Sequence, residues 1–467
     1  MNKFWVGFGI FIAFCLLYWY RLPQSLYINT DYGKDLFAIA KISRGHFSLL
    51  GPVLSAGFFA GPYYYYLMVP ALLLSGFNPY ALAATSVVLF SSSLAAAFYF
   101  FSRKFSLVSS VLAVLALGIS PLFIMAAREP ANGLTYLPLL LLFICLVYFQ
   151  PRFSLWSVMA LGLLAGVILN FDPVSVLALF PLTLYLIFKI GLKKAVIYGF
   201  FVLITYLPLM AFEVKNNFVI SRGFFLYKNY RTFLNNNNVV GAVSGSKNLI
   251  ENFSLISSRL FPLVGLTPLV WLLLVSVPLT IRRLRPGSFI ISLISFVLTV
   301  VLVRFKLEIH YLFPVSLLLL FSLLYAVASL KKTVLLLVVV VLLVAGFPVS
   351  RYRPTTQTFS LFQNAVDFTL SHRLIDPQTP FNLIAITDPH DYVPIGNEYR
   401  FAYLKRGLAV NTEFQYPQSR VLLLFSQIGD FDISSLNNWE VDQFGRSYLK
   451  NYQEFHAGQV IIYRVEK

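Results

Sequence analysis

Long apolar segments recur along this sequence and constrain its fold more than any other feature. Most run for about 15 to 20 residues with few or no charges, close to the length that an α-helix needs to cross a bilayer. Only 12% of the residues are charged, against about 25% in an average soluble domain. The pattern predicts a polytopic α-helical membrane protein with about eleven spans: 4–20, 80–101, 106–125, 136–150, 154–170, 174–190, 196–213, 261–280, 287–303, 311–329 and 333–350.

One further apolar block, 58–77, decides the orientation of every later span. It contains Gly61-Pro62, Pro70 and four successive tyrosines, Tyr63 to Tyr66. If it crossed the membrane, the short basic clusters that follow would face outward, against the positive-inside rule. We therefore expect an interfacial or re-entrant hairpin. The cytoplasmic side then receives these residues: Lys3, Arg103, Lys104, Arg152, Lys189, Lys193, Lys194, Arg282, Arg283, Arg285, Lys331 and Lys332.

The net charge of +17 raises the alternative of a nucleic-acid partner. The basic residues, however, stand in short clusters between apolar blocks, which is the pattern of membrane topology and not of a DNA-binding face. Residues 4–20 follow Lys3 and offer no small-residue cleavage site, so they are predicted to remain as a signal anchor. The sequence predicts an integral plasma-membrane protein that binds membrane lipids and no nucleic acid.

The tail after residue 350 differs in character from the rest of the chain. It is polar and mixed in charge, with strand-like stretches at 381–387, 420–425 and 459–465 and a helical pattern at 360–374. The sequence thus predicts two domains, a transmembrane domain 1–350 and a small soluble α/β domain 351–467. On the topology above, the second is extracytoplasmic.

The first external loop contains the most informative polar segment. Asp31 and Asp35 precede an amphipathic stretch that is expected to lie as a helix in the membrane interface. Their i,i+4 spacing would bring two carboxylates together and tends to raise one pKa, which suits a general base. The alternative is that Asp31 only caps the helix.

Other predicted external turns add charged and polar residues. Cations on this side break the charge rule, and an anionic ligand such as a lipid phosphate would explain them; the alternative is contact with lipid headgroups. The candidates are Arg128, Glu129, Asn132, Glu213, Arg222, Arg304, Lys306, His310 and Tyr311. Signatures of nucleotide hydrolysis and serine catalysis, and Cys/His metal spacings, are absent from the sequence.

Several motifs, taken in order, resemble the membrane glycosyltransferases of the C superfamily. They are the signal anchor, Asp31 and Asp35, the stretch Gly61 to Leu67, the turn with Arg128 and Asn132, the exit Phe212-Glu213-x-Lys215, and His310-Tyr311. The similarity covers about the first 315 residues and is nearest to the protein mannosyltransferases and the aminoarabinose transferase of lipid A. Asp31-Tyr32 departs from the Asp-Glu pair of many mannosyltransferases.

The resemblance implies a reaction. An inverting transferase would move a hexose or pentose from a polyprenyl phosphate to a hydroxyl of a glycan, lipid or protein acceptor on the extracytoplasmic face. Asp31 would be the base, and external cations would hold the phosphate. Asp35 and Glu129 join Asp31 as catalytic candidates, and Glu129 and Glu213 leave a divalent cation, Mg²⁺ or Mn²⁺, open as a cofactor.

Two other functions remain open from the sequence. A transporter or lipid flippase also has many spans, but it usually carries ionisable groups near the bilayer midplane and often shows internal repeats. Here the spans are nearly free of charge and the acidic residues stand at their ends. A non-catalytic scaffold is the third reading, and it requires Asp31 to be replaceable.

Overall fold

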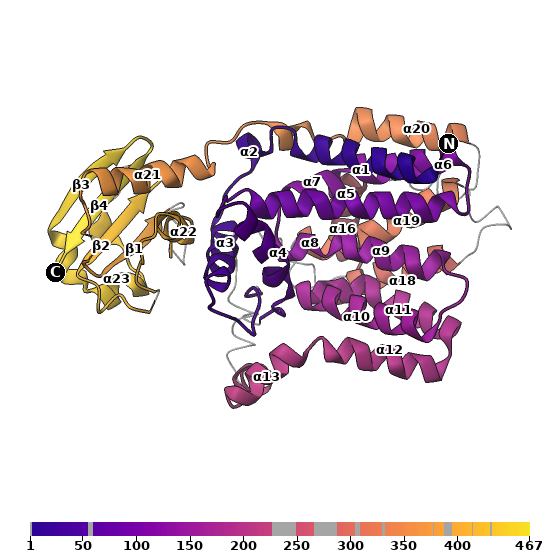
Figure 1. The fold of residues 1–467 in the computed structure, drawn as a ribbon, viewed down its shortest axis with the longest axis horizontal. Helices are drawn as coiled ribbons and strands as arrows, with labels where there is room; N and C mark the ends of the chain where they lie inside the picture. The colour runs from indigo at the N-terminus through magenta and orange to yellow at the C-terminus, as the bar shows by residue number, and fades with distance from the viewer. Residues whose placement is uncertain are drawn as a thin grey trace. The chain divides into compact units, whose positions relative to one another are not determined.

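The computed structural model describes residues 2–54, 59–226, 249–265, 287–303, 309–328, 332–376, 378–386, 395–412, 414–429 and 432–467. They form two compact units. Unit 1 comprises 1–22, 47–68 and 82–352, and unit 2 comprises 23–46, 69–81 and 353–467 (Figure 1). The predicted boundary at 350/351 lies beside the last change of unit, but unit 2 also takes in two segments of the first external loop.

Unit 1 is a bundle of apolar helices. In chain order they are α1 (Lys3–Trp19), α5 (Ala81–Ser102), α6 (Leu107–Ile119), α7 (Pro121–Arg128), α8 (Asn132–Thr135), α9 (Leu137–Phe149), α10 (Leu155–Phe171), α11 (Val176–Ile190), α12 (Leu192–Ile204), α13 (Leu207–Lys215), α14 (Val219–Leu226), α16 (Leu249–Val264), α18 (Gly287–Leu302), α19 (Phe313–Ala328) and α20 (Lys332–Val341). Short turns η1 (Pro173–Ser175), η2 (Ile309–Leu312), η3 (Leu342–Gly346) and η4 (Val349–Tyr352) connect or extend them.

The described helices confirm a polytopic helical protein but not the predicted number of spans. Five are long and apolar enough to cross a membrane, and the bent pairs α6–α7 (59°) and α12–α13 (51°) raise the number to seven if each pair is one span. The predicted spans 154–170, 287–303 and 333–350 contain shorter apolar helices, and most of 261–280 lies outside the described residues.

The block 58–77 forms one short helix, α4 (Tyr63–Leu74), which passes from unit 1 into unit 2. At 1.5 Å per residue its 12 residues extend about 18 Å, well short of the ~30 Å hydrocarbon core. The helix by itself is too short to cross a bilayer, and the interfacial or re-entrant hairpin stays a prediction.

Glycines let neighbouring helices of unit 1 approach closely. A methyl group on Gly162 of α10 would lie 2.5 Å from the Tyr198 carbonyl oxygen of α12, and one on Gly166 would lie 2.4 Å from Thr205 Oγ1. Small residues four apart are a common device for packing helices in membranes, where backbone contact replaces the hydrophobic effect. The sequence Gly-x-x-x-Gly at 162–166 thus accounts for the α10–α12 pair.

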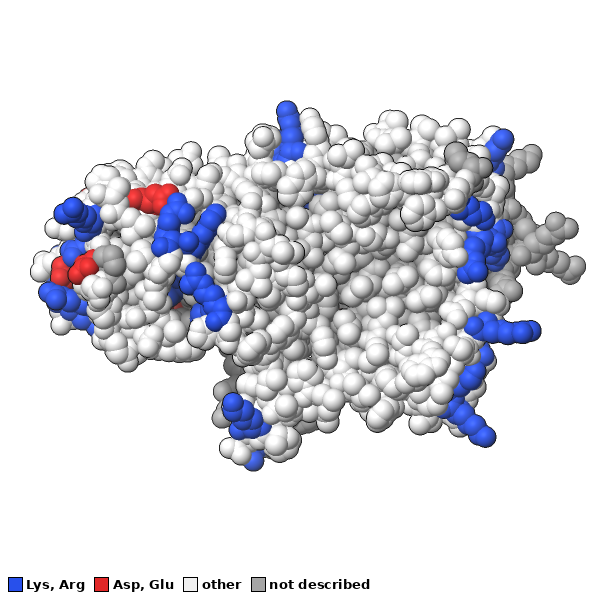
Figure 2. All heavy atoms as spheres, viewed as in Figure 1, with Lys and Arg blue, Asp and Glu red and all other residues white. Residues whose placement is uncertain are grey.

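Basic side chains gather at one end of the bundle, where Figure 2 shows Lys and Arg in blue. Four lysines link the predicted cytoplasmic ends of the helices there. Three of them donate hydrogen bonds from Nζ to backbone carbonyls: Lys3 to Ser102 (2.5 Å), Lys189 to Val147 (2.7 Å) and Lys194 to Phe153 (2.6 Å). The fourth, Lys104, has its Nζ 4.3 Å from the centre of the Tyr325 ring. The described loops that the charge pattern assigned to one side of the membrane therefore lie at one end of unit 1, whereas Arg282, Arg283, Arg285 and Lys331 lie outside the described residues.

Unit 2 contains a four-stranded sheet in the order β1-β2-β4-β3. Its strands are β1 (Phe381–Ile386), β2 (Val421–Ser426), β3 (Tyr452–Ala457) and β4 (Val460–Glu466), and β1 and β2 are parallel while the other pairs are antiparallel. The remaining elements are α2 (Leu22–Ser25, whose first residue belongs to unit 1), α3 (Thr30–Ser43), α21 (Phe359–Ser371), α22 (Asn397–Lys405), η5 (Ile433–Ser435), α23 (Trp439–Phe444) and η6 (Arg446–Lys450). The predicted small α/β domain is confirmed.

Candidate functional site

Asp31 lies in the first turn of α3, where it is exposed. The N-cap of this helix is Asn29, whose side chain accepts a hydrogen bond from the Tyr32 N–H at 2.8 Å. The Asp31 carboxylate pairs with Lys34 Nζ at 2.8 Å, and 81% of its side chain is accessible. The alternative that Asp31 merely caps the helix is therefore wrong, since Asn29 fills that position.

Asp35 has a different environment from Asp31. It is only 3% exposed, and Lys34 lies near both carboxylates. Burial would lower the pKa of Lys34, but the charges of Asp31 and Asp35 outweigh burial and hold that pKa above its ordinary value. A cation shared by the two carboxylates reduces the repulsion that their i,i+4 spacing implies.

The apolar face of α3 is covered by protein. Leu36, Ile39 and Ala40 are fully buried, and α3 packs against α22 so closely that a methyl group on Gly33 would lie 2.9 Å from the Glu398 backbone nitrogen. At the other end of α3, Arg44 Nη2 donates to the Leu404 carbonyl at 2.7 Å. The predicted amphipathic helix is present, its apolar residues are buried and it packs against α22; that it lies in the membrane interface stays a prediction.

Arg128 is the last residue of α7 and is only 3% exposed. Its Nη1 donates to the carbonyls of Tyr18 (2.5 Å) and Tyr20 (2.9 Å), and its guanidinium carbon lies 4.1 Å from the centre of the Tyr352 ring. The next residue, Glu129, forms an ion pair with Arg351. Both side chains therefore have partners within the protein, and phosphate binding by Arg128 stays a prediction.

The turn at Asn132 meets a second turn, at Phe171 and Asp172, which was not among the predicted site residues. Asn132 Nδ2 donates to the Phe171 carbonyl at 3.1 Å, and a methyl group on Gly133 would lie 3.0 Å from Asp172 Oδ2. Asp172 is 4% exposed and accepts from the Val174 N–H at 2.9 Å. The sequence signal that could have identified Asp172 as a site candidate is its position as an acidic residue in a predicted external turn. Glu129 was chosen on the same signal.

The loop at Gly61 joins this group of turns. The Gly61 N–H donates to the Asn170 carbonyl at 2.9 Å, and a methyl group on Gly61 would lie 2.1 Å from Asn170 Oδ1. The Tyr63 hydroxyl donates to the Thr205 carbonyl at 2.7 Å, and the Tyr64 ring packs edge-to-face on Phe171. The Gly61-Pro62-Tyr motif therefore has a packing role in unit 1.

Glu213 and Arg222 lie around one tight turn. The Glu213 carboxylate accepts from the N–H groups of Ile220 (2.9 Å) and Ser221 (2.8 Å), so it caps the first turn of α14. Arg222 follows on that helix with an exposed side chain. A cation held in an ordered helix and open to solvent remains available for an anionic ligand.

The remaining predicted cations are placed only in part. His310 and Tyr311 belong to η2, and their rings meet edge-to-face with centres 4.4 Å apart. Arg304 and Lys306 lie outside the described residues. Among the described residues, no three His, Cys, Asp or Glu side chains are grouped to ligate a metal ion, so the divalent cation stays a prediction.

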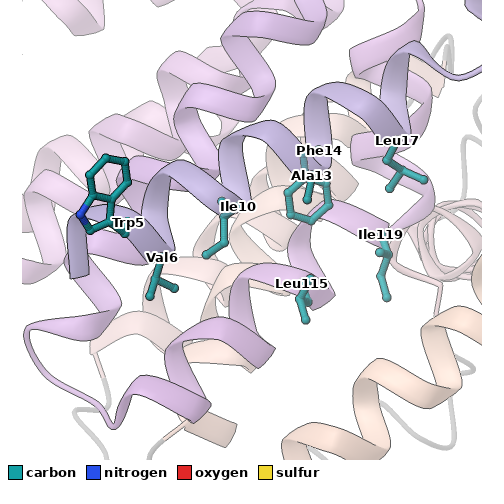
Figure 3. A pocket seen from close by; sticks show the side chains of 9 residues that line it. Trp5, Val6, Ile10, Ala13, Phe14, Leu17, Leu115 and Ile119 are labelled. Carbon is teal, nitrogen blue, oxygen red and sulfur yellow. The ribbon is translucent and has the colours of Figure 1, made fainter. Parts of the chain in front are cut away.

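An apolar groove runs between α1 and α6 in unit 1. Its volume is about 490 Å³, and Figure 3 shows side chains of α1, including Ile10, Phe14 and Leu17, above Leu115 and Ile119 of α6. The side chains that Figure 3 labels carry one polar atom, the Trp5 ring nitrogen. A hydrocarbon chain fits such a lining, but the groove offers no group for catalysis.

Comparisons with known proteins give a match in structure alone. No protein-family model and no curated protein sequence matches the chain. The crystal structure of ArnT from Cupriavidus metallidurans bound to undecaprenyl phosphate matches with a TM-score of 0.62 and 13% identity, over 100% of this chain and 98% of that one. The same protein in the apo state matches with a TM-score of 0.59 and 13% identity, over 98% and 97%. ArnT is the lipid A aminoarabinose transferase, a C-superfamily glycosyltransferase, and the chain described here has its fold, as the order of motifs predicted.

Proposed function

We propose that this protein is a glycosyltransferase that takes a sugar from a polyprenyl phosphate. The observation that carries the proposal is the match over the whole chain to a structure of ArnT that holds undecaprenyl phosphate. The match includes the small sheet domain as well as the helices, because it covers 100% of this chain. Acidic residues at helix ends, rather than in the middle of spans, favour this reading over a transporter.

The proposed reaction is a displacement with inversion at the anomeric carbon. Asp31 takes the proton of the acceptor hydroxyl, and the hydroxyl oxygen forms a bond to the anomeric carbon. The bond between that carbon and the phosphate oxygen breaks, and polyprenyl phosphate leaves with the electron pair. Asp31 and Glu129 are both ion-paired, with Lys34 and Arg351. Asp31 suits the base better because 81% of its side chain is accessible, against 42% for Glu129, and because Asp35 is buried.

Cations stabilise the charge that develops on the leaving phosphate, a type of contribution that is often the largest in catalysis. Arg222 is the best candidate among the described residues because its side chain is exposed at the start of α14. Arg304, Lys306 and His310 are further candidates. The proposal places the reaction on the extracytoplasmic side, because the charge pattern assigns the loops that contain Asp31 and Arg222 to that side.

The test is a transfer assay with purified protein in proteoliposomes. Polyprenyl-phosphate donors carrying a hexose, a pentose or an aminopentose are supplied with a lipid acceptor, and free polyprenyl phosphate and glycosylated product are both quantified. Product that depends on the protein and is lost in Asp31→Asn supports the proposal. Movement of intact donor across the bilayer without release of polyprenyl phosphate would instead identify a flippase.

A further inference from the structure

Two of the segments that join the units, the one after α1 and the one after η4, are held by the same residue, Arg128. The chain enters unit 2 after residue 22 and enters it for the last time after residue 352. The residues just before these two points both contact Arg128. Its guanidinium donates to the carbonyls of Tyr18 and Tyr20 and stacks on Tyr352.

The two segments continue together inside unit 2. The Thr355 N–H donates to the Gln24 carbonyl at 2.9 Å, and the Ile28 N–H donates to the Gln357 carbonyl at 3.0 Å. Within unit 1, the centres of the Tyr20 and Tyr352 rings lie 6.2 Å apart. The two segments are therefore paired both before and after they enter unit 2.

Arg128 is well suited to hold such a pair. A guanidinium presents planar, fixed donors and an apolar face, so one group can bind carbonyls in its plane and an aromatic ring above it. Lysine offers the charge without the plane. The neighbouring Glu129–Arg351 ion pair adds a second link between the end of α7 and η4.

We propose that Arg128 is a positioning residue that clamps the first and last connections to unit 2 and so limits the arrangements open to that unit. Any effect of the clamp on turnover rests on the proposed function. The clamp itself is a property of the fold and can be measured without substrate.

The experiment measures the distribution of distances between the units by electron–electron double resonance. Spin labels are attached at Lys193→Cys in unit 1 and Lys450→Cys in unit 2, both exposed, in full-length protein with Cys15 and Cys145 replaced by Ala and reconstituted in nanodiscs. Arg128→Gln is compared with Arg103→Gln. Arg103 is a matched control because it lies in unit 1 and contacts an aromatic ring, that of Tyr99 at 5.3 Å.

The clamp predicts a broader distribution in Arg128→Gln than in the parent or in Arg103→Gln, with Arg128→Lys between them. Tyr352→Leu and Arg351→Gln, which remove contacts of the second segment and leave the Arg128 hydrogen bonds to the first, should broaden the distribution in part; they decide the question if Arg128→Gln does not fold. The proposal is overturned if these variants fold and their distance distributions are as narrow as that of the parent, or if the distribution of the parent is already as broad as theirs.

In the transfer assay Arg128→Lys should lower kcat more than it raises the donor KM. A parent without transferase activity would contradict the proposed function and leave the distance result standing.

Discussion

Individual charged residues divide into those that the fold already uses and those that it leaves open. Arg128, Glu129 and Glu213 have partners that explain them: backbone carbonyls, Arg351 and the N–H groups that begin α14. Arg222 is exposed on an ordered helix, and Asp31, although paired with Lys34, keeps 81% of its side chain accessible. For Arg128 and Glu129 sequence spacing cannot make this distinction, because their partners lie 108 to 222 residues away along the chain.

Replacing the proposed base tests the reaction most directly. Asp31→Asn keeps the size of the side chain and removes its basicity, so we expect turnover to fall about 10²-fold or more with donor binding preserved. The control is Asp376→Asn, an aspartate of unit 2 that accepts a local hydrogen bond from the Gln378 N–H. Turnover and donor binding are measured in proteoliposomes.

Asp35→Asn completes that comparison. An inactive but folded Asp35→Asn beside an active Asp31→Asn would assign the base to the buried carboxylate. Normal turnover in both variants would remove the first external loop from the mechanism.

The exposed cation of α14 has its own prediction. If Arg222 contacts the donor phosphate, Arg222→Ala should mainly raise the apparent donor KM, and Arg222→Lys should raise it less, because lysine retains the charge but not the bidentate geometry. The same pair of substitutions at Arg304 tests the second candidate. Unchanged donor dependence in all four variants contradicts phosphate binding by either residue; Arg103→Ala is the control.

At the scale of elements, sequence periodicity predicted which segments form helices and strands, but not which of these elements pack against each other. The strands β1, β2 and β4 are fully or mostly buried and were found from their apolar composition, whereas β3, Tyr-Gln-Glu-Phe-His-Ala, is an exposed edge strand whose polar residues hide it. The amphipathic pattern of α3 correctly predicted a helix with one buried face, but such a pattern does not indicate what covers that face. In a membrane protein a lipid surface and a distant helix such as α22 give the same signal.

The α10–α12 contact gives a prediction about packing. A methyl group on Gly162 would lie 2.5 Å from a backbone oxygen of α12, so Gly162→Ala must separate the helices, which typically costs about 1–3 kcal/mol. Gly199→Ala is the matched control, since a methyl group there meets nothing within 4 Å and alanine favours the helix by up to about 1 kcal/mol. Thermal unfolding in detergent should show a lower Tm only for Gly162→Ala; equal Tm values would contradict this close approach.

For the whole molecule, charge placement predicts the orientation in the membrane. Residues 103, 152, 193, 283 and 331 should face the cytoplasm and the tail after 351 should not. Single cysteines introduced at these positions, with Cys15 and Cys145 removed, are labelled with an impermeant maleimide in intact cells. Position 450 should be labelled and the five others protected. External labelling at 283 would contradict the map.

The pairing of α3 with α22 has a consequence for how the protein is made. The ribosome completes α3 at Ser43 and reaches Asn397, the first residue of α22, some 350 residues later. At about 5–20 residues per second this interval lasts roughly 20 to 70 s. Throughout it, α3 lacks the helix α22 against which it packs, while the intervening spans enter the bilayer. During translation, α3 must therefore be shielded by lipid or by a chaperone until α22, which lies in the last quarter of the polypeptide, has been synthesised.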